Sequence, residues 1–391
     1  MSAMKKLSDI APLSEKHHSE KPPVKKPAGS HKQPSLLKDR AVAKLAKHRR
    51  WIIIASILAA GIVTAFVMYH FMSGTTDFKS TGVKHPDQAD QATKYYSPLT
   101  GREVSNQAAT KRSVLAVMIE NSPEARPQSG LKDAGVVFEA VAEGGITRFI
   151  TLYQDNEPSL IGPVRSVRPY YLDWAAAFSP AVAHVGGSTE ALNMLRSGSY
   201  GVDLDQFANG AAYWRAKDRR APHNVYTDYS HLAGLASNKG KTGSDFSGIT
   251  RRAVDSTAKT DGEAATTIKL AVSTGQFAVS YAYDTDSHTY LRYQGNVAHQ
   301  DREKGQVSPD VVIALQVNQT LQSDRLHNTI TTIGSGGCYV FQDGTVTKGT
   351  WHKDSPTSQL TLLDEAGQPI QLKRGQTWIT AIANGKAITW E

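Results

Sequence analysis

The residue types best suited to recognise a charged ligand gather in residues 133–190, which contain three arginines and no lysine. The planar guanidinium of arginine binds a carboxylate or a phosphate through two parallel hydrogen bonds, whereas the lysine ammonium offers a point charge. Prolines on either side of Arg165 and Arg168 form a rigid frame for these long side chains. Arg148, Arg165 and Arg168 are therefore predicted to be donors to an anionic group.

Two carboxylates, Glu139 and Glu143, precede these arginines and leave three interpretations open. They can belong to a buried Arg–Glu network that fixes loop packing, they can tune an anion-binding pocket, or they can form a catalytic acid/base pair. Spacing alone does not place two carboxylates around a scissile bond. The predicted ligand-binding residues are Asn121, Arg126, Glu139, Glu143, Arg148, Arg165, Arg168, His184, Ser188, His223 and Asn224.

Local catalytic motifs fail on inspection. Gly240-Lys241-Thr242 lacks the glycine spacing of a phosphate-binding loop, and residues 186–190 lack the final glycine of a nucleophile elbow. Ser188 fits a helix N-cap better than a nucleophile. There is no His-Glu-x-x-His sequence, so we predict no metal and no cofactor. Catalytic residues are unknown, and whether the chain is an enzyme stays open, with the balance toward binding.

The positive charge of the chain is concentrated at its N-terminus. Residues 1–50 hold 13 Lys+Arg and 4 Asp+Glu, a net charge of +9, and the remaining residues hold 31 and 32, a net charge of −1. A nearly neutral main part argues against nucleic acid as a partner. The tail, rich in Lys, Pro and Ser, is predicted to be disordered and to attract anionic lipid.

A run without Asp, Glu, Lys or Arg follows this tail at residues 51–72. Its length suits a helix that crosses the lipid bilayer, and the basic flank predicts a cytoplasmic N-terminus and an extracytoplasmic main part. We expect a retained single-pass signal anchor in the cell membrane rather than a cleaved signal peptide. Residues 73–94 are polar and are predicted to be a spacer.

The patterning changes along the rest of the chain. Residues 95–245 mix β-prone runs at 114–119, 149–153 and 181–185 with helical segments at 170–178, 188–198 and 228–237. Residues 246–265 indicate a linker or loop. Residues 266–391 show strand patterns at 277–283, 289–293, 311–317, 338–341 and 377–382. The predicted fold class is α+β: a mixed α/β N-terminal part packed with a mostly antiparallel β C-terminal part, behind one transmembrane helix.

Several long motifs resemble one known family. They are Arg126-Pro-Gln-Ser-Gly, Glu143-Gly-Gly-Ile-Thr-Arg148, Gly162-Pro-Val-Arg-Ser-Val-Arg168, Gly186-Gly-Ser188, Pro222-His-Asn-Val-Tyr226 and Gly375-Gln-Thr-Trp378. Together these motifs are similar to the YerB-like lipoprotein family, whose domain has no known function. The resemblance implies a two-part α+β envelope domain at the outer face of the cytoplasmic membrane, and it implies no established reaction. This chain departs from the lipoprotein pattern because no cysteine stands beside residues 51–72.

These observations predict a membrane-anchored extracytoplasmic domain that binds an anionic ligand or an envelope component through an arginine-rich site. One alternative is a hydrolase or transferase on cell-wall polymers, with Glu139 or Glu143 and His184 as acid and base. Another is a scaffold without a small ligand. The expected partners are the bilayer and a cell-wall or envelope-protein component.

Overall fold

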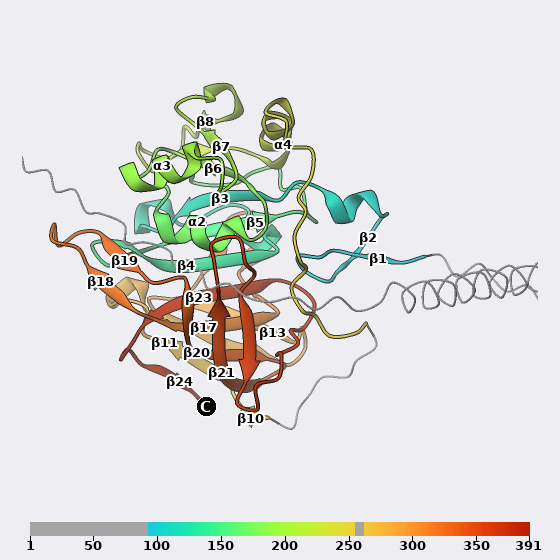
Figure 1. Cartoon of the computed structure of the whole chain (residues 1–391). Helices are drawn as coiled ribbons and strands as arrows, with labels where there is room; N and C mark the ends of the chain where they lie inside the picture. Colours follow the sequence, from blue (N-terminus) through green and yellow to red (C-terminus); the bar gives the residue numbers. More distant parts are fainter. Residues whose placement is uncertain (1–92, 255–261) are drawn as a thin grey trace, which may run out of the picture. The chain divides into compact units, whose positions relative to one another are not determined.

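The computed structural model describes residues 93–254 and 262–391 (Figure 1). In these residues the α-helices are α2 (Pro169–Ala176), α3 (Thr189–Arg196) and α4 (Tyr229–Asn238), and short 3₁₀ helices are η1 (Ala108–Lys111), η2 (Pro123–Ala125), η3 (Leu131–Asp133), η4 (Gly210–Ala212) and η5 (Gly275–Phe277). The first strands are β1 (Tyr95–Tyr96), β2 (Glu103–Val104), β3 (Leu115–Glu120), β4 (Val136–Glu143), β5 (Ile146–Tyr153), β6 (Ala181–His184), β7 (Val202–Asp205), β8 (Trp214–Arg215) and β9 (Val225–Tyr226).

Strands dominate the chain after residue 261. They are β10 (Glu263–Ala264), β11 (Thr267–Leu270), β12 (Val279–Asp284), β13 (Thr289–Gln294), β14 (Val297–Ala298), β15 (Gln300–Asp301), β16 (Gly305–Gln306), β17 (Val311–Val317), β18 (Gln319–Leu321), β19 (Asn328–Ile330), β20 (Gly334–Gln342), β21 (Thr345–Lys353), β22 (Thr361–Asp364), β23 (Thr377–Ala383) and β24 (Ile388–Trp390).

One large mixed sheet runs through both halves of the chain. Its strands lie in the order β10-β21-β20-β17-β23-β4-β5-β3-β6-β7, with β22 paired to β21. The strand β23 is the junction, because it pairs in parallel with β17 on one side and with β4 on the other. Figure 1 shows these strands from distant parts of the sequence side by side. The hairpin β4–β5 and strand β3 are antiparallel neighbours, whereas β3, β6 and β7 are parallel.

The central strands of this sheet, β3, β4, β5, β17 and β23, are buried on both faces, which explains their nearly continuous apolar runs. Leu115, Val117 and Ile119 point into one core, and Ala116 and Met118 point into the other. The first core also contains side chains of α4 and of a five-stranded antiparallel sheet, β14-β13-β12-β11-β24. The second core contains side chains of α2 and α3. The alternation follows from the strand period of two.

Local sequence signals set the starts of the helices, and the N-cap expected at Ser188 is present. Ser188 caps α3, because its hydroxyl accepts a hydrogen bond from the backbone nitrogen of Ala191. Asp228 caps α4 in the same way through the backbone nitrogen of His231. Pro169 stands at the first turn of α2, where its missing N–H costs nothing.

The predicted fold class is wrong. The described residues are mostly β with three short helices, and the N-terminal and C-terminal parts share one sheet instead of packing as a mixed α/β part against a β part. The period-two pattern located the strands but carried no signal for which strands become neighbours. Across residues 93–254 and 262–391, none of the helices has the length and apolarity needed to cross a membrane. The predicted span at 51–72 lies outside the described residues.

Candidate functional site

Two predicted site residues, Glu143 and Arg148, lie near the ends of neighbouring strands, and they are joined there by Glu120, which was not predicted. Glu120 is the last residue of β3, Glu143 is the last residue of β4, and Arg148 lies near the start of β5. Glu120 and Arg148 are register partners across the antiparallel pair β3–β5. The sheet therefore brings these charged side chains to the same end of these strands. The loops after residue 161 add the remaining arginines.

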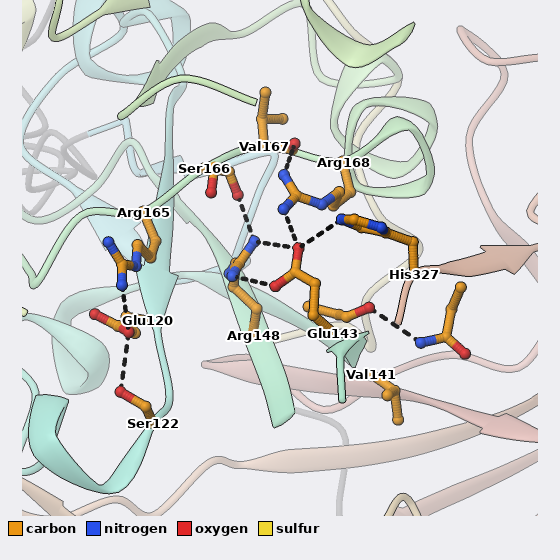
Figure 2. A network of polar contacts seen from close by, with 12 residues as sticks. Glu120, Ser122, Val141, Glu143, Arg148, Arg165, Ser166, Val167, Arg168 and His327 are labelled. Atoms are coloured by element: carbon orange, nitrogen blue, oxygen red, sulfur yellow. Dashed lines mark hydrogen bonds and ion pairs between the residues drawn. The ribbon is translucent and has the colours of Figure 1, made fainter. Parts of the chain in front are cut away.

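The first cluster is centred on the carboxylate of Glu143 (Figure 2). Nη2 of Arg148 lies 2.7 Å from Oε2, and Arg168 forms an ion pair with Oε1. The ring of His327, which comes from the connection between β18 and β19, approaches Oε1 at 4.0 Å. Arg148 also donates to the carbonyl of Ser166 at 2.8 Å. Figure 2 shows Arg148, Arg168 and His327 pointing toward this one carboxylate.

This pairing engages both arginines with one carboxylate, so neither guanidinium is without an ion-pair partner. Burial raises the pKa of Glu143, but the charges of Arg148 and Arg168 outweigh it and hold the pKa below its ordinary value. Glu143 is therefore ionised, and its side chain is only 18% exposed. A cavity of about 340 Å³ borders Arg168 and His327. The histidine was missed by the sequence analysis, because it lies far along the chain from the other members.

The second cluster is centred on Glu120, which is buried. Its Oε1 atom lies 3.2 Å from Nη2 of Arg165 and 2.9 Å from Nδ1 of His223. Ser122 donates to the same oxygen at 2.9 Å. The other oxygen, Oε2, is buried and has no hydrogen-bond partner among the described residues. The structure therefore brings Arg165 and His223 together through Glu120. Figure 2 shows Arg165 and Ser122 at Glu120, apart from the Glu143 cluster.

Glu139 belongs to neither cluster. Both of its carboxylate oxygens accept from Nη2 of Arg292, at 3.0 and 2.9 Å, and one also accepts from the indole of Trp378 at 3.0 Å. Both side chains of the ion pair are 0% exposed. A carboxylate with both oxygens occupied and no access to solvent is unsuited to acid/base catalysis on a polymer.

The Glu139–Arg292 pair is part of a closed ring of buried hydrogen bonds. Its members, in order, are Glu139, Arg292, His299, Gln128, Asn121 and Thr147, and Thr147 donates back to Glu139. Burial and the charges of Arg292 and Arg126 hold the pKa of His299 well below its ordinary value. The neutral imidazole of His299 accepts from Arg292 and donates to Gln128. Every hydrogen bond in the closed set therefore has a defined direction.

The remaining predicted residues have separate structural positions. Arg126 joins the ring from outside, because its Nε donates to Asn121 at 3.1 Å. His184 is fully buried and contacts Asp203 at 3.1 Å and the carbonyl of Gly186 at 2.9 Å, so within the described residues its hydrogen bonds and ion pairs do not involve the arginines. Ser188 caps α3. Asn224 donates to two carbonyls of the preceding loop, those of Ala216 and Arg219.

An open cavity of about 690 Å³ lies beside the Glu120 cluster. The charged side chains of its lining are Glu124, Arg126, Asp218, Arg219, Arg220, His223 and Arg302. Four guanidinium groups and one imidazole thus face two carboxylates. Arg219, Arg220 and Arg302 were not predicted, although an available signal was the Arg-Arg pair just before the Pro222-His-Asn-Val-Tyr226 motif.

The arginines of this cavity differ in how far they are already engaged. Arg219 donates to the carbonyls of Glu124 and Pro127, and Arg302 forms an ion pair with Asp218 at 2.8 Å. Arg220 is exposed, and its guanidinium has no hydrogen bond or ion pair within the described part of the chain. Within that part, no group of three or more His, Cys, Asp or Glu side chains is arranged to hold a metal ion.

Comparison with known proteins defines the class. Residues 99–242 match the N-terminal domain, and residues 268–379 the C-terminal domain, of the family described as "Protein of unknown function (DUF3048)". The chain belongs to this family.

One relative is the Bacillus subtilis (strain 168) protein named "Putative lipoprotein YerB". It is 32% identical over 301 residues, which cover 75% of this chain and 88% of the relative. The crystal structure of YerB from Bacillus subtilis matches with a TM-score of 0.68 at 29% identity, over 76% of this chain and 100% of that chain. The resemblance to the YerB-like family is therefore confirmed.

Proposed function

We propose that this protein is an envelope protein that binds an oxyanion in the 690 Å³ cavity beside the Glu120 cluster. The observation that carries the proposal is the cavity lining, in which Arg126, Arg219, Arg220 and Arg302 outnumber the two carboxylates. Guanidinium groups around an open cavity favour a phosphate or carboxylate group. The predicted donors Arg148, Arg165 and Arg168 are not placed at the centre of this site, because each already forms an ion pair with Glu120 or Glu143.

The test is a substitution of Arg220, whose guanidinium supports no other contact within the described residues. We expect Arg220→Gln to weaken the binding of inorganic phosphate to the full chain by roughly tenfold, because a charge-assisted pair is lost. Titration calorimetry measures the affinity. Arg196→Gln is the matched control, since Arg196 is an exposed arginine at the end of α3. Equal phosphate affinity for Arg220→Gln and the wild type, or no phosphate binding by the wild type, would contradict the proposal.

The proposed location is the membrane-associated envelope, outside the cytoplasm. It is supported by the word "lipoprotein" in the name of the Bacillus subtilis relative. We expect the full chain to sediment with membranes, and residues 95–391 to be digested by protease added to wall-stripped cells. A variant that lacks residues 1–72 reports whether the attachment precedes residue 73. A main part that resists protease in wall-stripped cells, but not in lysed cells, would reject this location.

We do not propose the hydrolase or transferase with Glu139 as its acid or base, because that carboxylate is buried and fully paired. A partner in the cell wall or among envelope proteins stays a prediction, as does the attraction of the basic tail to anionic lipid.

A further inference from the structure

The imidazole of His223 has one engaged nitrogen and one available nitrogen. Nδ1 lies 2.9 Å from Oε1 of Glu120 and 3.2 Å from Oγ of Ser122. Nε2 has no hydrogen-bond partner among the described residues. The ring is 22% exposed and lines the 690 Å³ cavity. Nδ1 faces the buried Glu120, and Nε2 lies on a different edge of the imidazole. Nε2 is therefore the nitrogen that is available to the cavity.

The contacts of Glu120 determine where the ring carries its proton. An ionised carboxylate only accepts hydrogen bonds, and Oε1 already receives the hydroxyl of Ser122 and the ion pair of Arg165. Nδ1 must therefore carry the hydrogen that it shares with Oε1. In the neutral ring, Nε2 then presents a lone pair to the cavity. The carboxylate thus orients the ring and selects its tautomer.

The other charged groups around this nitrogen come from every segment that lines the cavity. Glu124 belongs to η2 and Arg126 follows it directly. Asp218, Arg219 and Arg220 come from the segment before His223, and Arg302 from the connection between β15 and β16. Guanidinium groups only donate. Glu124 and Asp218 accept hydrogen bonds but are negatively charged. Among the charged and ionisable side chains of this lining, the neutral His223 ring therefore differs from both kinds, because it accepts a hydrogen bond and carries no negative charge.

We infer that the oxyanion bound in this cavity carries its own hydrogen, as hydrogen phosphate does, and that His223 accepts it. This inference rests on the proposed function. Sulfate has the same shape and charge as hydrogen phosphate at about pH 8, but it has no hydrogen to donate. Its oxygen would face the lone pair of Nε2, and an unmatched polar contact is costly. The site therefore selects a protonated phosphate group over sulfate.

Such a phosphate group has two sources, the free ion and the headgroup of a lipid such as phosphatidic acid. Vesicles of phosphatidylcholine, with and without phosphatidic acid, separate them. Competition between these vesicles and inorganic phosphate for the cavity assigns the lipid headgroup as the source. Phosphate binding that the vesicles leave unchanged assigns the free ion.

The experiment compares inorganic phosphate and sulfate by titration of the full wild-type chain at about pH 8. We expect phosphate to bind roughly tenfold to a hundredfold more tightly than sulfate, because only phosphate donates to Nε2. In His223→Phe, which keeps a ring but removes the acceptor, the two affinities should differ by less than about threefold. The thermal melting temperature of this variant shows whether it folds.

Different results overturn different parts of the argument. Equal binding of phosphate and sulfate by the wild type overturns the role of His223 and leaves the proposed anion site intact. Binding of neither ion overturns the proposed function itself. A His223→Phe chain that folds and keeps the full preference for phosphate assigns the selectivity elsewhere, which also overturns this inference.

Discussion

At the scale of single residues, the role of each arginine depends on whether a carboxylate reaches it. Arg292 is fully buried and has a glutamate partner, whereas Arg220 is exposed at the cavity and has no such partner within the described residues. The first arrangement stabilises the fold, because a buried charge is tolerated only when paired. The second keeps donors available to a ligand.

The buried pair makes a direct stability prediction. Glu139→Gln removes the negative charge opposite Arg292 and leaves that cation buried at 0% exposure. We expect the free energy of unfolding to fall by about 3–5 kcal/mol, as for other broken buried pairs. Thermal melting followed by tryptophan fluorescence measures the loss. Glu190→Gln, at an exposed glutamate in the first turn of α3, is the control and should change stability by less than about 0.5 kcal/mol. If Glu139→Gln loses no more stability than Glu190→Gln, the buried ion pair is not needed for stability.

The sequence offered an Arg–Glu network as one interpretation of Glu139 and Glu143 but did not assign their partners. Glu143 pairs with Arg148, five positions away on the neighbouring strand. Glu139 instead pairs with a residue 153 positions away, and Glu120 pairs with His223 at a separation of 103. No local pattern connects residues at such distances, since their approach depends on the order of strands in the sheet. Arg292 was therefore missed.

At the scale of elements, the sequence predicts the positions of individual helices and strands well. The expected strand at 311–317 coincides with β17, and the three expected helices coincide with α2, α3 and α4 to within two residues at each end. Periodicity and N-capping side chains are local properties, so a local analysis detects them. Which strands pair with β23 is not a local property. A strand that is buried on both faces can pair with many other strands, and its apolar sequence does not specify which ones.

At the scale of the whole molecule, the two matched family domains share one sheet. The register of β23 joins Thr377 to Val136 and Thr380 to Glu139, so the C-terminal part completes the N-terminal sheet. The ring of buried hydrogen bonds crosses between the same parts, because Arg292 and His299 bond to Glu139 and Gln128. Separating them would expose the edges of β4 and β23 together with an unpaired buried charge.

We therefore predict that neither part folds alone. Residues 93–254 and 262–391, expressed separately, should each lack a cooperative thermal transition by circular dichroism, and mixing them should restore one. The control is a chain that folds intact and is then cut at a protease site introduced between residues 254 and 262. It should keep its transition and its tryptophan fluorescence, because β23 remains paired with both β17 and β4. Two fragments that each melt cooperatively near the temperature of the full chain would show that the shared sheet joins two independent domains rather than forming one unit.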